Sequence, residues 1–214
     1  MAYGKFTYLT NKLDDFVLRA QAFAPAATQY VALLTCTNGL LARSTAYALN
    51  NTVVVDAADG IYHLYKVTTA GTTASGAPAY PGAPNEVITD GTAVLTEQAS
   101  ELQAGTAQVE PTGGGYARAS IASSLTAWSG TQGAGTTVAS TGTAGTISNN
   151  VAITFPTTTA AWAAAPAAVW GFAFYDSLTG GNGYYFGPLS SGPIAIGASV
   201  TPSFAAAAAS VHEQ

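Results

Sequence analysis

The sequence predicts a mainly β protein, in which a β-sandwich host domain carries one short N-terminal helix and a small inserted three-stranded β module. Apolar runs of strand length recur along the chain, separated by stretches rich in glycine, proline and asparagine. Some runs alternate between apolar and polar residues, as at 151–155, and others are continuously apolar, as at 169–175. Helical periodicity occurs only near the N-terminus. Roughly seven or eight runs fall in the host part, which is typical of a β-sandwich.

The segment 151–176 contains the most distinctive pair of runs. An alanine-rich connection joins them, and large aromatic residues concentrate in both. We expect these side chains to be the inward faces of strands that pack on one core. The predicted assembly core, meaning the packed centre of the host domain, consists of Tyr116, Phe155, Trp162, Trp170, Phe172 and Phe174.

The N-terminal segment predicts the helix. Asn11 is the expected N-cap, with Asp14 at the third helical position, and the helix should end before Pro25. A short apolar strand is expected next, at 30–35. The predicted apolar face of the helix combines Leu13, Phe16, Val17 and Ala20.

An inserted module is predicted because the middle of the chain is richer in charged residues than its flanks. Alternating strands are expected at 51–55 and 61–68, and a loop rich in glycine and proline leads to a third strand at 92–96. The predicted domains are a discontinuous β-sandwich at 1–40 and 99–214 and the inserted β module at 41–98.

Charge is scarce and unevenly distributed. Charged residues make up 8% of the chain, against roughly a quarter in ordinary soluble domains. All six Lys and Arg residues lie at or before Arg118, and beyond it the only acids are Asp176 and Glu213. A salt bridge between Arg118 and Asp176 is one of several arrangements open to these groups. A monomer whose surface carries so few charges over the C-terminal half of the chain is poorly protected against association. We therefore expect copies of the chain or a partner to cover it, and we expect a homo-oligomer.

Composition also excludes several classes of partner. The net charge of −5 and the lack of a basic cluster argue against nucleic acid. No apolar run is long enough for a signal peptide or a membrane span, so we expect no membrane contact and synthesis in the host cytoplasm. Cys36 has no partner for an internal disulfide and follows an apolar run, so burial is expected, with an intermolecular disulfide as the alternative.

No motif for catalysis, metal or cofactor binding stands out. His63 and His212 have no serine or cysteine nucleophile in a recognisable context. The turn that holds Asp56 and Asp59 is too short to wrap calcium. The three glycines at 113–115 do not open a helix and no lysine follows them, so a phosphate-binding loop is not expected. We predict no enzymatic activity, no cofactor and no metal.

Four stretches of the host part carry a resemblance to a known family. They are LDDFVLRAQAFAPAATQYVALLT (13–35), GGGYARASI (113–121), ISNNVAITFPTTTAAW (147–162) and the C-terminal stretch 169–208, which ends in SFAAAA. Together they resemble virion structural proteins of tailed bacteriophages, often labelled tail fibre or structural protein. The resemblance implies assembly with other virion proteins, either the major capsid protein or tail subunits.

The insert has a resemblance of its own. The stretches STAYALNNTVVV (44–55), YHLYKVTTAGTTASGAPAYP (62–81) and ITDGTAVLTE (88–97) are similar to a small three-stranded, carbohydrate-binding-like module of phage tail proteins. Such modules stack sugar rings on aromatic faces, so a cell-surface glycan is a candidate partner. Packing of a small core explains the same tyrosines equally well. The candidate stacking residues are Tyr47, Tyr62, Tyr65 and Tyr80.

The expected function is that of a non-enzymatic virion structural protein. The chain has no heptad region, collagen-like period or long repeat from which to build a fibre shaft. A compact unit with a neutral surface and a projecting module suits an exterior capsid decoration or cement protein on the virion surface. The alternatives are a tail fibre or baseplate appendage and a sugar-binding host-attachment protein.

Overall fold

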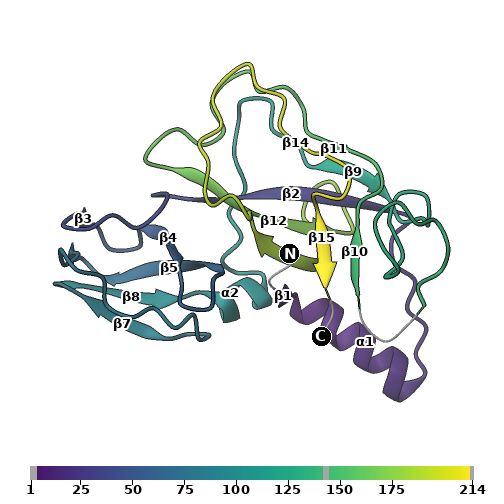
Figure 1. Ribbon diagram of the computed structural model, residues 1–214, viewed down its shortest axis with the longest axis horizontal. Helices are drawn as coiled ribbons and strands as arrows, with labels where there is room; N and C mark the ends of the chain where they lie inside the picture. Colours follow the sequence, from purple (N-terminus) through teal and green to yellow (C-terminus); the bar gives the residue numbers. More distant parts are fainter. Residues whose placement is uncertain (1–3, 142–144, 213–214) are drawn as a thin grey trace.

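The computed structural model describes residues 4–141 and 145–212 and confirms the mainly β class (Figure 1). The central element is a five-stranded antiparallel sheet with the strand order β1-β13-β12-β2-β9. Its strands are β1 (Gly4–Lys5), β13 (Gly183–Pro188), β12 (Ala168–Tyr175), β2 (Thr28–Cys36) and β9 (Ala119–Ala122).

Strand β12 lies in the middle of this sheet and is buried along its whole length. An irregularity in its pairing with β2, between Val169 and Gly171, shifts the alternation of its side chains. Phe172 and Phe174 therefore belong to one core, whereas Trp170 and Tyr175 belong to another on the opposite face. The aromatic run packs on two cores and not on the single core that was predicted.

The first core lies on the face that carries Phe172 and Phe174. Two short ladders contribute to its cover, β10 (Thr146–Ser148) paired with β15 (Ser210–His212) and β11 (Ile153–Thr154) paired with β14 (Ser203–Phe204). Long irregular loops join these ladders (Figure 1). The layer that covers this face of the host sheet is thus built from loops and two-stranded pairs.

The insert forms a four-stranded sheet, one strand more than predicted. Its order is β4-β5-β8-β7, and a two-stranded pair of β3 and β6 accompanies it. The additional strand β7 pairs with β8 through a two-residue hairpin, in which Gly91 has a φ of +65°. The strands are β3 (Ala46–Tyr47), β4 (Thr52–Asp56), β5 (Tyr62–Thr69), β6 (Gly71–Thr72), β7 (Val87–Asp90) and β8 (Ala93–Glu97).

The second core joins the insert to the host sheet. Val54 and Leu64 of the insert belong to the same buried cluster as Trp170 and Phe186 of the host. Leu102 completes it from a second helix, α2 (Ala99–Ala104), which the sequence pattern did not predict. The insert sheet is therefore packed against the host, so the division at 41–98 stays a prediction about folding units.

The first helix, α1 (Thr7–Arg19), begins earlier than predicted. Phe6 occupies the N-cap position and is buried in the second core, so Asn11 lies inside the helix and the predicted cap was wrong. The predicted apolar face was wrong in part: Leu13 packs against the first core beside the buried Leu9, but Phe16 and Val17 are exposed.

Candidate functional site

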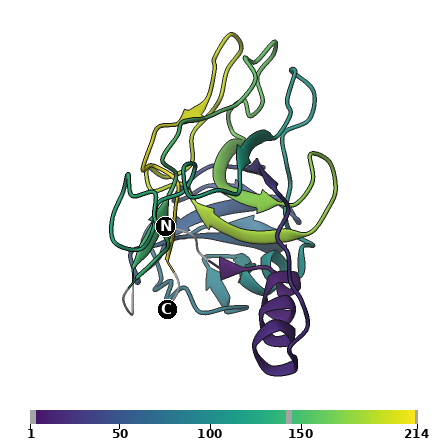
Figure 2. The same ribbon diagram turned by 90° about the vertical axis from the view of Figure 1, so that its right-hand side faces the viewer.

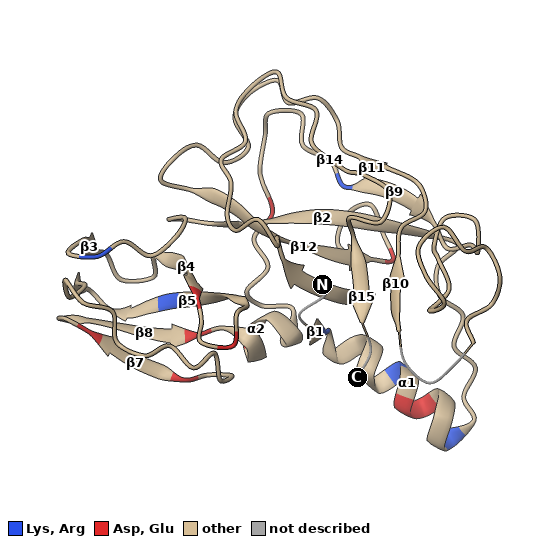
Figure 3. Cartoon of the chain, viewed as in Figure 1, with Lys and Arg blue, Asp and Glu red and all other residues tan. Residues whose placement is uncertain are grey.

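Charged residues are scarce in one large part of the fold (Figure 3). They concentrate on α1 and on the insert, whereas the loops and short ladders that cover the first core are almost free of them. Beyond Arg118 the one charged residue that the structure describes is Asp176, since Glu213 lies outside the described residues. Asp176 is occupied within its own turn, where it accepts hydrogen bonds from Asn182 N and Nδ2, each 2.7 Å long.

Two adjoining hollows form an apolar trough beside α1. The larger, of about 480 Å³, is lined by residues that include Leu125, Trp128 and Phe174. The smaller, of about 350 Å³, lies against the helix and is lined by residues that include Leu13 and Phe16. Pro25, Gln29 and Tyr185 line both hollows, so the two lie side by side.

The C-terminal end of α1 is an exposed apolar knob, called here the α1 tip. It consists of Phe16, Val17 and Leu18, whose exposed fractions are 55%, 72% and 78%. The helix projects past the sheets, as the second view makes clear (Figure 2). The sequence contained a signal for this exposure that the face assignment missed: three consecutive helical residues span too wide an arc to face one core.

Arg118 is buried and does not pair with Asp176. Its guanidinium group donates to Glu110, with Nη2 2.6 Å from Oε1, and Nη1 donates to the backbone carbonyls of Ser177 and Gly180. The Tyr116 hydroxyl also donates to Glu110, over 2.8 Å. This network joins the linker before β9 to the β12–β13 turn. Arg118 pairs with Glu110, and Asp176 is hydrogen-bonded to Asn182.

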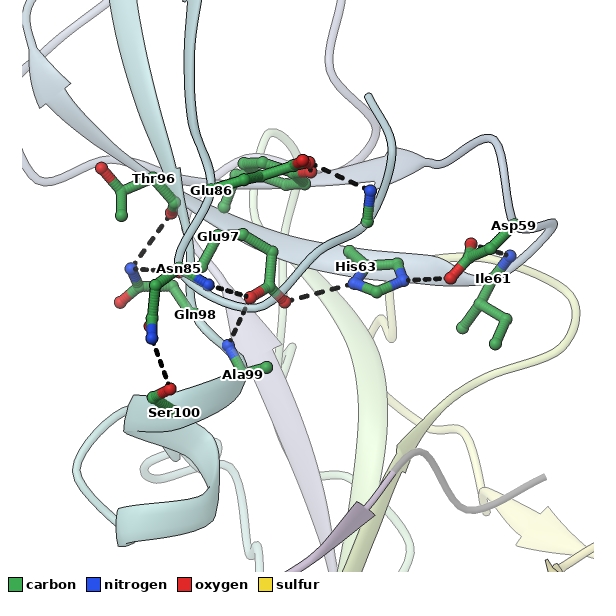
Figure 4. Close-up of polar contacts among 12 residues, drawn as sticks. Asp59, Ile61, His63, Asn85, Glu86, Thr96, Glu97, Gln98, Ala99 and Ser100 are labelled. Carbon is green, nitrogen blue, oxygen red and sulfur yellow. Dashed lines mark hydrogen bonds and ion pairs between the residues drawn. The ribbon is translucent and has the colours of Figure 1, made fainter. Parts of the chain in front are cut away.

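A second polar cluster lies where the insert meets α2, with His63 between two carboxylates (Figure 4). His63 Nδ1 is 3.2 Å from Glu97 Oε1, and Nε2 is 2.9 Å from Asp59 Oδ2. An ionised carboxylate only accepts hydrogen bonds, so this geometry suits a protonated ring in which both nitrogens donate. Burial lowers the pKa of His63, but hydrogen bonds and charge attraction from Glu97 and Asp59 outweigh it, so the net pKa is raised.

Glu97 also fixes the backbone around this cluster. Its Oε2 accepts hydrogen bonds from the backbone N–H groups of Asn85 and Ala99, at 3.1 and 2.8 Å. Ala99 is the first residue of α2, and Asn85 lies in the loop before β7. The fully buried carboxylate of Glu97 therefore joins three segments, β8, this loop and α2. These contacts give the cluster a structural role, since they connect segments of the chain to one another.

The tyrosines proposed for sugar stacking lie mostly inside the insert. Tyr47, Tyr65 and Tyr80 are buried, and the rings of Tyr65 and Tyr80 meet edge to face at 5.3 Å. The Tyr80 hydroxyl donates to the buried Asp90 over 2.7 Å, and Tyr65 donates to Glu86. Only Tyr62 of the four keeps part of its surface exposed. A ring without an exposed face offers a sugar nothing to stack on, which favours the packing role for three of the four. Glycan binding itself stays a prediction.

The residues of the predicted assembly core are interior packing residues. Phe155, Trp162, Phe172 and Phe174 are buried in the first core, and Tyr116 packs against it half-buried. Trp170 faces the other way, into the core shared with the insert. These side chains hold the surface loops in place, and their part in assembly stays a prediction.

The structure also bears on metal binding, thiol reactivity and membrane spans. Within residues 4–141 and 145–212, no group of three or more His, Cys, Asp or Glu side chains is placed to hold a metal ion. Cys36 is buried, and burial raises the pKa of its thiol to about 12, so the reactive thiolate is scarce at neutral pH. None of the helices in these residues is long and apolar enough to span a membrane.

The comparisons with known proteins identify the class as a structural protein of tailed phages. Residues 92–212 match the family described as Podophage GP4 fiber I protein gp80. The match covers more than half of the chain, from β8 through α2 and the C-terminal part of the host, so the chain belongs to this family. The expectation of a virion-associated phage structural protein is confirmed. No curated protein matches the chain. The resemblance of the insert to a carbohydrate-binding-like module stays a prediction.

Proposed function

We propose that the chain is a non-enzymatic decoration protein on the exterior of the capsid, where it docks on other virion subunits and projects the insert. The observation that carries the proposal is the segregation of charge. The loops and ladders over the first core present almost no charge, while the insert holds a large share of the acidic residues (Figure 3). A surface that is buried in an assembly avoids charged groups, because each would need a partner after losing its water.

The geometry of the chain supports a projecting insert. The four-stranded sheet lies at one end of the molecule, while α1 and the long loop between β9 and β10 lie at the other (Figure 1). The core shared by Val54, Leu64 and Trp170 packs the insert sheet directly on the host. The insert would therefore keep a fixed orientation relative to the virion surface on which the host domain docks.

A tail fibre or baseplate appendage is the second candidate, because the matched family takes its name from a fibre protein. An appendage would use the same uncharged surface on a tail subunit in place of the major capsid protein. The two candidates differ in copy number, since a capsid presents many equivalent docking positions and a tail presents few.

Copy number is the decisive measurement. Purified virions, separated on a gel and quantified by densitometry, should contain this chain in a molar amount comparable to the major capsid protein. A few copies per particle would contradict decoration and support the appendage. Tail-less capsids, isolated from the same lysate, provide the control: they retain the chain if it decorates the head and lack it if it belongs to the tail.

A further inference from the structure

The α1 tip is an unusual surface for a free chain. It consists of three consecutive large apolar residues, Phe16, Val17 and Leu18, and each is more than half exposed. Helices of about 13 residues are marginal in water without tertiary packing, and Leu9 is the one residue of α1 that is fully buried. The last turn is held within the chain by the ion pair between Arg19 and Asp15 on its exposed side. Large apolar residues gathered in this way mark an interaction site.

The apolar trough is the complementary feature. None of the residues that line its two hollows is Asp, Glu, Lys or Arg. Leu125, which is 54% exposed, lies on the wall of the larger hollow. Phe16 of the α1 tip also lines the smaller hollow, so the trough and the tip adjoin. The α1 tip and the apolar trough are therefore neighbours on one surface of the chain.

We propose that the α1 tip of one copy docks into the apolar trough of a second copy of this chain. The proposal goes beyond the function proposed above, because it concerns contacts between copies and holds whether the chain sits on the head or the tail. Because tip and trough adjoin, a rotation that seats one tip in the partner's trough also brings the partner's α1 against the first. Such reciprocal contacts are the pattern of closed symmetric oligomers.

The charges around the two surfaces suit this occupant. The four charged residues of α1 near the tip, Lys12, Asp14, Asp15 and Arg19, sum to zero. A neutral knob thus enters an uncharged trough, and no ionised group has to be buried without a partner. The insert lies at the opposite end of the molecule, so two copies joined at α1 would both point their insert sheets outward (Figure 1).

Disulfide trapping between two differently tagged single variants of the full chain tests the contact. Leu18→Cys and Leu125→Cys proteins, mixed and oxidised, should give a cross-linked heterodimer. Leu49→Cys changes a leucine of the insert that is also more than half exposed, and it serves as the control in place of Leu18→Cys. The native Cys36 is buried and contributes little background. Cross-linking no stronger than with the Leu49 control would overturn the proposal.

Sedimentation supplies an independent readout. The wild-type chain should associate, and Leu18→Asp should raise the concentration for half-dissociation by about tenfold or more. Val87→Asp, which changes an exposed apolar residue of β7, should leave association unchanged. Circular dichroism establishes that both variants fold. A wild-type chain that stays monomeric, or a Leu18→Asp variant that associates normally, would show that another virion protein or no partner at all occupies the trough.

Discussion

The guanidinium carbon of Arg118 lies 3.7 Å from the centroid of the Tyr175 ring. Tyr175 ends β12, and Arg118 stands immediately before β9, so the stack connects the central strand with the edge of the host sheet. The same guanidinium group binds Glu110 and two carbonyls of the β12–β13 turn. One buried side chain thus contacts three other segments of the host: the end of β12, the linker that carries Glu110 and the β12–β13 turn.

Replacement of Arg118 by alanine should lower the free energy of unfolding by about 3–5 kcal/mol, because it leaves Glu110 without its partner in a partly buried site. Urea denaturation followed by fluorescence provides the measurement. Arg19→Ala is the matched control: its ion pair with Asp15 is exposed, and its loss should cost about 0.3–0.5 kcal/mol. Equal losses in both variants would contradict a structural role for Arg118.

His63 should make stability depend on pH. Its pKa is raised in the folded chain above the unfolded value of 6.5, because Glu97 and Asp59 accept hydrogen bonds from the protonated ring. The stabilisation is therefore fully present below pH 6.5 and is lost as the pH rises through the raised folded pKa. Urea midpoints measured across this range should fall with increasing pH.

His63→Gln is the control for this dependence, because glutamine keeps donors and acceptors but does not titrate. The variant should be less stable at low pH, and its urea midpoint should change less as the pH rises above 6.5. The other titratable groups near the ring, Glu86 and the Tyr65 hydroxyl, are present in both proteins. Parallel pH profiles for the two proteins would rule out His63 as the source.

Gly171 should not tolerate a side chain. A Cβ at this position would lie 2.6 Å from the backbone oxygen of Gly187 on the paired strand β13. Gly171→Ala should therefore cost about 1–3 kcal/mol through overpacking. Gly197→Ala provides the comparison, since no atom lies within 4 Å of its added Cβ and its φ is not positive. A thermal unfolding midpoint unchanged in Gly171→Ala would disprove the close approach.

The docking role of the uncharged surface leads to a prediction about incorporation. Thr154 is an exposed residue of β11 on that surface. Thr154→Lys should reduce incorporation into virions at least about tenfold, because burying an unpaired ammonium group costs more than 1.4 kcal/mol. Thr89→Lys makes the same change on β7 of the insert and should be incorporated normally. Both purified variants should unfold at the wild-type temperature. Normal incorporation of Thr154→Lys would count against burial of this position.

Much of the fold could be predicted from local pattern, and most of the site could not. The apolar run at 169–175 predicted a buried strand, and its burial is complete. The alternation around Thr52–Asp56 and Tyr62–Thr69 likewise predicted two insert strands. The α1 tip was missed because the face assignment disregarded the wide arc that the consecutive Phe16, Val17 and Leu18 span on a helix.

The sequence by itself determined the mainly β class, the positions of the principal strands and the uneven distribution of charge. These follow from side-chain alternation and composition, which are local properties. Only the tertiary structure decided what each face meets. Trp170 faces the insert because Val54 and Leu64 cover that side of the sheet. Arg118 binds Glu110 in place of Asp176, and the buried Tyr80 donates a hydrogen bond to Asp90. Such contacts join residues distant in sequence, and a local pattern indicates that a face will be buried without specifying which segment will bury it.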